Sequence, residues 1–203
     1  MQSIDNKILS RIYGHGRGYS FSSSDFISEF KDNNIDKSFS NLAKEKKIRR
    51  VARGIYDYPK YSELLGQELS PDIDAVAQAY ARKFNWKIEI SGESALNYLG
   101  LSTQVEANYV YLSNGPSRSY NIGNTTLRFK HTALKNIGFR YKESSIIVQA
   151  LKALGEKHID DKTKEKLITW LTPKSCDRIL KDTKTATTWI YEMIKDICQK
   201  VKS

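Results

Sequence analysis

Five basic side chains lie close together in the sequence, at a spacing that suits a polyanionic ligand. They are Lys46, Lys47, Arg49, Arg50 and Arg53, and Gly54 follows the last of them. Lysine and arginine neutralise the phosphates of a nucleic acid and release its counterions. A glycine at the tip of a basic turn favours a hairpin that lies along the DNA backbone or enters the minor groove. The sequence therefore predicts DNA contacts from Lys47, Arg49, Arg50, Arg53 and Gly54.

A helical pattern immediately precedes this basic segment. Ile35, Phe39 and Leu42 form one apolar stripe, and polar side chains occupy the opposite face. These polar side chains are Lys37, Ser40, Asn41 and Lys44. Short or basic polar groups on an exposed helix suit contacts with base edges and phosphates in a major groove. A solvated helix face is the alternative, and the basic segment that follows favours DNA contact over it.

The elements around both segments follow the order helix, strand, helix, helix, strand, turn, strand. The first helix starts at Ile4 and is ended by the glycines at 14, 16 and 18, and a strand follows at 19–21. A capping box at 22–25 predicts a second helix through Phe30. A turn at 32–34, a third helix through Glu45 and two strands within 47–58 complete the pattern. This order is that of a winged helix-turn-helix. We expect a DNA-binding domain over residues 1–66, with a linker in the stretch from Lys60 to Leu69.

Residues 67–203 predict a second domain of mixed helices and strands that is helical from about residue 145. Ser70-Pro71-Asp72 is typical of a helix start, with Ser70 as the cap and proline at the first helical position. Three strands are expected within 109–131, and their aromatic residues suit core packing better than base stacking. The fold class predicted for the whole chain is α+β.

A strip of basic residues in this second domain has two interpretations. Its members are Arg118, Arg128, Lys130, Lys135 and Arg140. Arg128 and Lys130 share one face of a strand, so the strip is able to extend a DNA surface. The alternative is that it is solvated or faces an acidic partner.

Other patterns that suggest chemistry do not meet the requirements of that chemistry. Gly14-x-Gly16-x-Gly18 follows a helix and precedes a strand, the reverse of a dinucleotide-binding loop. Asp72 and Asp74 are two apart on a helix and point away from each other, so they do not share a metal. Cys176 and Cys198 have no His or Cys neighbour at ligand spacing. We expect no catalytic residue, no metal and no cofactor.

Composition limits the remaining possibilities. The formal net charge is +10, with 33 basic and 23 acidic side chains, which favours a polyanionic partner. No apolar run approaches the roughly 20 residues of a membrane span, and the N-terminus lacks the features of a secretory signal. The expected location is the cytoplasm, without membrane association.

Several segments resemble AbiEi-family antitoxins, bacterial partners of a nucleotidyltransferase-like toxin. They are Ile8–Gly18, Lys47–Pro59, Ser70–Ala79, Ser91–Ala95, Leu99–Gln104 and Tyr111–Arg118. The resemblance covers most of the chain to about Asn136. Its most specific part is the Arg-x-x-Arg-Gly-x-Tyr pattern from Arg50 to Tyr56.

The resemblance implies a winged-helix repressor of its own toxin–antitoxin operon, joined to a domain that counteracts the toxin in phage defence by abortive infection. The partners would be double-stranded operator DNA and the cognate toxin, contacted directly or opposed functionally. The positions carried over are the third helix together with Arg49, Arg50, Arg53 and Gly54. Two alternatives stay open: an enzyme of nucleic acid that uses the winged helix to reach its substrate, and a plain winged-helix transcription regulator.

Overall fold

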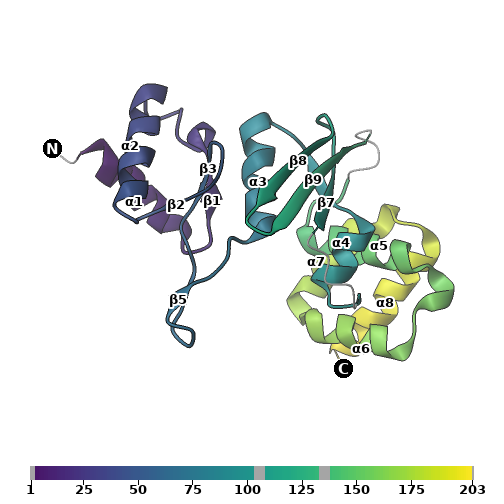
Figure 1. The fold of residues 1–203 in the computed structure, drawn as a ribbon. Helices are drawn as coiled ribbons and strands as arrows, with labels where there is room; N and C mark the ends of the chain where they lie inside the picture. Colours follow the sequence, from purple (N-terminus) through teal and green to yellow (C-terminus); the bar gives the residue numbers. More distant parts are fainter. Residues whose placement is uncertain (1–2, 103–107, 133–137, 203) are drawn as a thin grey trace. The chain divides into compact units, whose positions relative to one another are not determined.

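A computed structural model describes residues 3–102, 108–132 and 138–202. Helices and small antiparallel sheets share the chain, which confirms the α+β class (Figure 1). The chain divides into two compact units. The first comprises Met1–Lys87 with Ser119–Leu127, and the second comprises Ile88–Arg118 with Arg128–Ser203.

The elements at the start of the first unit follow the order that the sequence predicts, with a 3-10 turn in place of the second helix. They are α1 (Ile4–His15), β1 (Ser20–Phe21), the 3-10 helix η1 (Ser23–Asp25), α2 (Asp32–Lys44), β2 (Arg49–Ala52) and β3 (Ile55–Asp57). The three strands form an antiparallel sheet in the order β1-β3-β2. β2 and β3 are joined by a two-residue turn, so they form a hairpin, here called the wing.

The expected second helix is reduced to η1. The Ser22 amide donates to the Asp25 carboxylate, as a capping box requires, but the chain leaves the helical path after one turn. Three consecutive serines compete for backbone hydrogen bonds and give little helical support, which explains the early end. The expected turn at 32–34 is also wrong, because α2 already begins at Asp32 with Lys31 as its N-cap.

Aromatic packing holds this part of the unit together. Phe21 of β1 lies 5.8 Å from Phe26 and 5.3 Å from Phe39 of α2, measured between ring centroids, and all three are buried. The Phe26 and Phe39 rings meet edge to face at 5.5 Å, a favourable arrangement for aromatic pairs. Ile8 and Ile12 of α1 complete this core.

The stretch expected to be a linker is a second hairpin. It pairs β4 (Tyr61–Ser62) with β5 (Gln67–Glu68). Leu64 at its tip is 95% exposed. The short alternating segments on either side of Gly66 pair with each other, which the sequence analysis did not anticipate.

α3 (Ile73–Phe84) packs against β1, η1 and β3. Asp72, and not Ser70, is its N-cap, because the Asp72 carboxylate accepts hydrogen bonds from the amides of Asp74 and Ala75. The Arg82 guanidinium forms an ion pair with Asp25 and donates to the carbonyl of Ser20. These contacts place α3 in the first unit, so the structural division at Lys87 differs from the expected boundary after residue 66.

A segment distant in sequence also belongs to the first unit. Tyr80 of α3 stacks on Tyr120, with ring centroids 3.9 Å apart, and Tyr120 lies within the segment Ser119–Leu127. The first unit is therefore discontinuous in sequence.

The remaining strands form a four-stranded sheet, and the remaining helices belong to the second unit. The strands are β6 (Ile88–Ile90), β7 (Asn108–Ser113), β8 (Arg118–Ile122) and β9 (Thr125–His131), in the order β6-β7-β9-β8. The helices are α4 (Gly92–Tyr98), α5 (Lys142–Leu154), α6 (Asp161–Trp170), α7 (Pro173–Asp182) and α8 (Thr188–Lys202), with 3-10 turns at Glu156–His158 and Thr183–Thr185. The predicted helical region after residue 145 is thus confirmed.

The core of the second unit lies between the last helices. Leu151 of α5, Leu167 of α6, Ile179 of α7 and Ile194 of α8 are all buried in one cluster. Cys176 and Cys198 belong to the same cluster and are free thiols. Burial raises the pKa of the Cys198 thiol, so this sulfur stays protonated.

Within the described part of the chain, no helix is both long enough and apolar enough to cross a bilayer.

Candidate nucleic-acid interface

α2 presents the two faces that its sequence predicts. Ile35, Phe39 and Leu42 are fully buried, whereas Lys37, Ser40 and Lys44 are exposed. The Ser40 hydroxyl donates to the Asp36 carbonyl one turn earlier, which leaves its oxygen able to accept a hydrogen bond. α2 therefore offers two exposed cations and one hydroxyl to a ligand.

Asn41 differs from the other predicted α2 residues because its amide is used within the fold. Its Nδ2 donates to the Asp5 carboxylate of α1 at 3.1 Å, and the Ser38 hydroxyl donates to the other Asp5 oxygen at 2.5 Å. These hydrogen bonds, from Ser38 first and then from Asn41, lower the pKa of Asp5. Asn41 thus fixes α2 against α1, and its part in base contact stays a prediction.

Replacing Asp5 with alanine is expected to destabilise the protein by about 1 kcal/mol at neutral pH, since two hydrogen bonds to a charged but partly solvated group are lost. A carboxyl group whose pKa is lowered in the folded state contributes stability above its ordinary pKa of 3.8. That contribution disappears as the pH falls through the folded-state pKa. Urea unfolding at pH 7 and pH 3 should show the difference from the wild type shrinking in acid. A constant difference would assign the loss to packing alone.

Three lysines, Lys44, Lys46 and Lys47, lie near the negative end of the α2 helix dipole. Lys44 and Lys46 are exposed, and Lys46 takes the left-handed backbone conformation with φ +56°. The Lys47 ammonium lies 2.7 Å from the Glu45 carboxylate, which raises the pKa of Lys47. Such exposed pairs are weak and exchange readily with another anion. Lys47 therefore remains able to reach a phosphate.

Arg49 and Arg50 have opposite roles, although the sequence grouped them together. Arg49 Nη2 lies 2.6 Å from Asp57 Oδ2, and Arg49 Nε donates to Asp57 Oδ1. Asp57 is only 2% exposed and faces Arg49 across the β2–β3 ladder. A third hydrogen bond joins Arg49 to the Leu69 carbonyl. The guanidinium of Arg49 is thus committed to the fold, so the structure does not support its predicted DNA contact.

Arg50 points the other way because successive side chains of a strand alternate. It is exposed, and it forms no ion pair with any residue in the described ranges. Arg53 and Gly54 form the turn of the wing, where Arg53 is also exposed and Gly54 has φ +70°. A glycine accepts this conformation without strain. Arg50 and Arg53 are the arginines that the wing offers to a ligand.

Lys83 of α3 also lies at the tip of the wing, although it is not among the predicted residues. Its ammonium donates to the Gly54 carbonyl at 3.3 Å, and a side chain at position 54 would clash with it. No local pattern identifies this residue, since it lies 29 positions from Gly54 and beyond the expected domain boundary. Only the packing of α3 on the sheet brings the two together.

The basic strip is partly described. Leu127 and Phe129 of β9 are buried while Arg128 and Lys130 are exposed, which confirms that these two cations share a face. Arg118 and Arg140 are exposed too. Lys135 lies outside the described residues. Both interpretations of this strip, a DNA surface and a solvated or acidic-partner surface, stay predictions.

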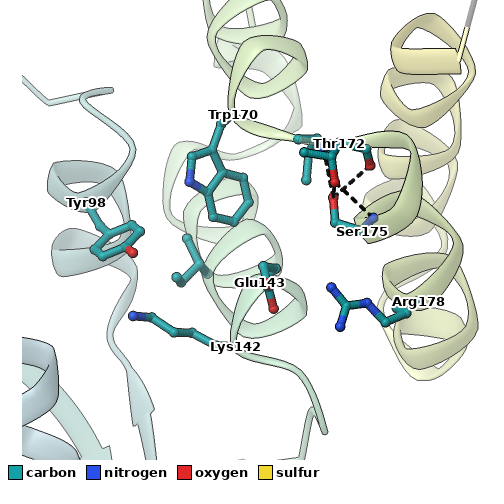
Figure 2. Close-up of a pocket in the computed structure, with 9 residues that line it drawn as sticks. Tyr98, Lys142, Glu143, Trp170, Thr172, Ser175 and Arg178 are labelled. Atoms are coloured by element: carbon teal, nitrogen blue, oxygen red, sulfur yellow. Dashed lines mark hydrogen bonds between the residues drawn. The ribbon is translucent and has the colours of Figure 1, made fainter. Parts of the chain in front are cut away.

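The second unit contains a pocket of about 370 Å³ between α4, α5 and α7. Figure 2 shows Thr172 and Ser175 facing each other at the start of α7, and both hydroxyls are used in the capping box of that helix. The Lys142 ammonium lies 4.8 Å from the centre of the Tyr98 ring. Within the part of the chain that the structure describes, no three His, Cys, Asp or Glu side chains converge as a metal site would require.

Fold and surface together define an α+β protein whose first unit displays cations on a helix and on a neighbouring hairpin. The chain belongs to the family of unknown function DUF6088, whose model matches residues 7–179. None of the curated proteins is significantly similar to it. The structure of the RV2827C protein from Mycobacterium tuberculosis is similar at 10% identity and a TM-score of 0.41, covering 97% of this chain and 76% of that one.

Proposed function

We propose that this chain is a winged helix-turn-helix protein that binds double-stranded DNA in the cytoplasm, with α2 in the major groove and the wing on the adjacent backbone. One observation carries the proposal: the exposed cations Lys37, Lys44, Arg50 and Arg53 lie on α2 and on the wing of a unit whose strand order is β1-β3-β2. In helix-turn-helix proteins the recognition helix reads base edges and the flanking elements hold the backbone. The predicted readers are Lys37, Ser40 and Asn41, of which Asn41 already donates to Asp5.

The test is selection of duplexes from a random library by the full chain, followed by binding of the enriched sequence and of a shuffled version. We expect one sequence to be enriched and to bind at least 10³-fold more tightly than the shuffled duplex, as specific DNA-binding proteins do. A match in the DNA upstream of the protein's own gene would support autoregulation. Equal affinity for both duplexes would contradict sequence-specific binding.

We further propose that the protein is the antitoxin of a toxin–antitoxin pair, a role supported by the resemblance of its first two thirds to AbiEi-family antitoxins. Co-expression with a neighbouring nucleotidyltransferase-like reading frame tests this role. Growth should be restored by the full chain and by a variant that no longer binds DNA. Failure of the full chain to restore growth would leave a transcription regulator as the function.

A further inference from the structure

Two cationic side chains lie at the tip of the wing. Arg53 is exposed at the turn, and the Lys83 ammonium of α3 is held there by the Gly54 carbonyl. Neither forms an ion pair with a residue in the described part of the chain. Carbonyl binding fixes the Lys83 ammonium but does not neutralise it, so the tip carries two positive charges.

The electrostatic environment of Lys83 agrees with this geometry. Burial, and then the positive charge of Arg53, lower the pKa of Lys83. Asp36 of α2 acts in the opposite direction and raises it, so Lys83 lies within electrostatic reach of both α2 and the wing. An anion beside Arg53 and Lys83 would relieve their mutual repulsion.

We infer that Arg53, Lys83 and the Gly54 turn form a binding site for one backbone phosphate of DNA, which extends the interface beyond the winged helix into α3. The inference rests on the proposed DNA binding. Arginine offers a planar pair of donors to phosphate oxygens, and lysine adds a compact charge. Because Gly54 has no side chain, the Lys83 ammonium is able to lie beside the turn, next to the exposed Arg53.

The test compares Lys83→Gln with Lys60→Gln, measuring binding of a selected duplex by fluorescence anisotropy over a range of salt concentrations. Lys60 comes after the C-terminal end of β3, whereas the tip of the wing precedes the N-terminal end of that strand. The Lys60 ammonium lies 3.8 Å from the Asp72 carboxylate, and Lys60 serves as the matched charge control. Loss of the Lys83 charge should make the slope of log affinity against log salt shallower by up to about 0.9 and weaken binding by up to roughly eightfold at 0.1 M salt, because Arg53 still contacts the phosphate. Lys60→Gln should behave like the wild type.

Lys83→Arg should keep the wild-type slope, because it keeps the positive charge. Comparing it with Lys83→Gln therefore separates the effect of the charge from a structural effect of the substitution. An unchanged slope in Lys83→Gln would overturn the inference while leaving the proposed DNA binding intact. So would equal losses in Lys83→Gln and Lys60→Gln. If the wild type itself binds no duplex, the proposed function fails first and this site fails with it.

Discussion

Replacing Lys44, Arg50 and Arg53 together with alanine is expected to weaken duplex binding by roughly 10² to 10³-fold at 0.1 M salt. Each phosphate contact contributes about 0.9 to the slope of log affinity against log salt, so three contacts contribute close to 2.7. All three side chains are exposed, and none is used in an ion pair among the described residues. The fold should therefore tolerate their loss. Anisotropy titrations at several salt concentrations measure both quantities.

The matched control removes three exposed lysines from the second unit, Lys157, Lys181 and Lys184. This variant has the same net charge as the first. We expect its affinity to stay within about threefold of the wild type, because none of these lysines belongs to the proposed interface and salt at this concentration screens exposed charges. Equal losses in both triple variants would attribute binding to total charge and would remove α2 and the wing from the interface.

Replacing Arg49 with alanine is expected to have its largest effect on folding. The Asp57 carboxylate is buried, and without Arg49 it loses its charged partner. Breaking a fully buried ion pair costs roughly 3–5 kcal/mol; since the Arg49 side chain is 29% exposed, we expect about 2–4 kcal/mol. Arg50→Ala is the adjacent control and should cost no more than about 0.5 kcal/mol, as surface substitutions usually do.

The pH dependence of this loss has a definite sign. Burial raises the pKa of Asp57, and the hydrogen bonds and charge of Arg49 lower it again. In Arg49→Ala the folded-state pKa rises further, so the folded protein keeps a proton that the unfolded chain releases. Stability then falls as the pH rises through this window. Denaturant unfolding should show a smaller loss at pH 5 than at pH 7.5. A loss that is independent of pH would mean that Asp57 is not the group left unpaired.

The elements of the fold were largely predictable, because their signals are local. Apolar residues spaced for one helix face identified α1, α2 and α3, and the glycine turns separated the strands. Where a local signal was ambiguous the prediction was wrong: Ser22–Asp25 has the form of a capping box, but three serines do not sustain a helix after it. Likewise Ser70 has the chemistry of a cap, and Asp72 takes the role because it directly precedes the first helical turn.

The candidate interface was predictable only in part, because its details depend on contacts between distant residues. Strand alternation puts Arg49 and Arg50 on opposite sides, but it does not tell which side holds a buried carboxylate. That answer comes from the register of the wing, which pairs Arg49 with Asp57. Lys83 enters because α3 packs on the sheet, where Arg82 beside it forms an ion pair with Asp25, 57 positions away. No spacing within α3 carries that information.

The discontinuity of the first unit affects how the chain folds during synthesis. A nascent protein emerges N-terminus first, at about 5–20 residues per second, and domains generally fold as units. The first unit lacks its last segment until Leu127 has left the ribosome, when the residues from Ile88 to Arg118 have already emerged. β7, which lies in that interval, must wait for β9 before its second edge is paired. Translation that stalls between these strands would leave an exposed β edge, and such edges promote aggregation.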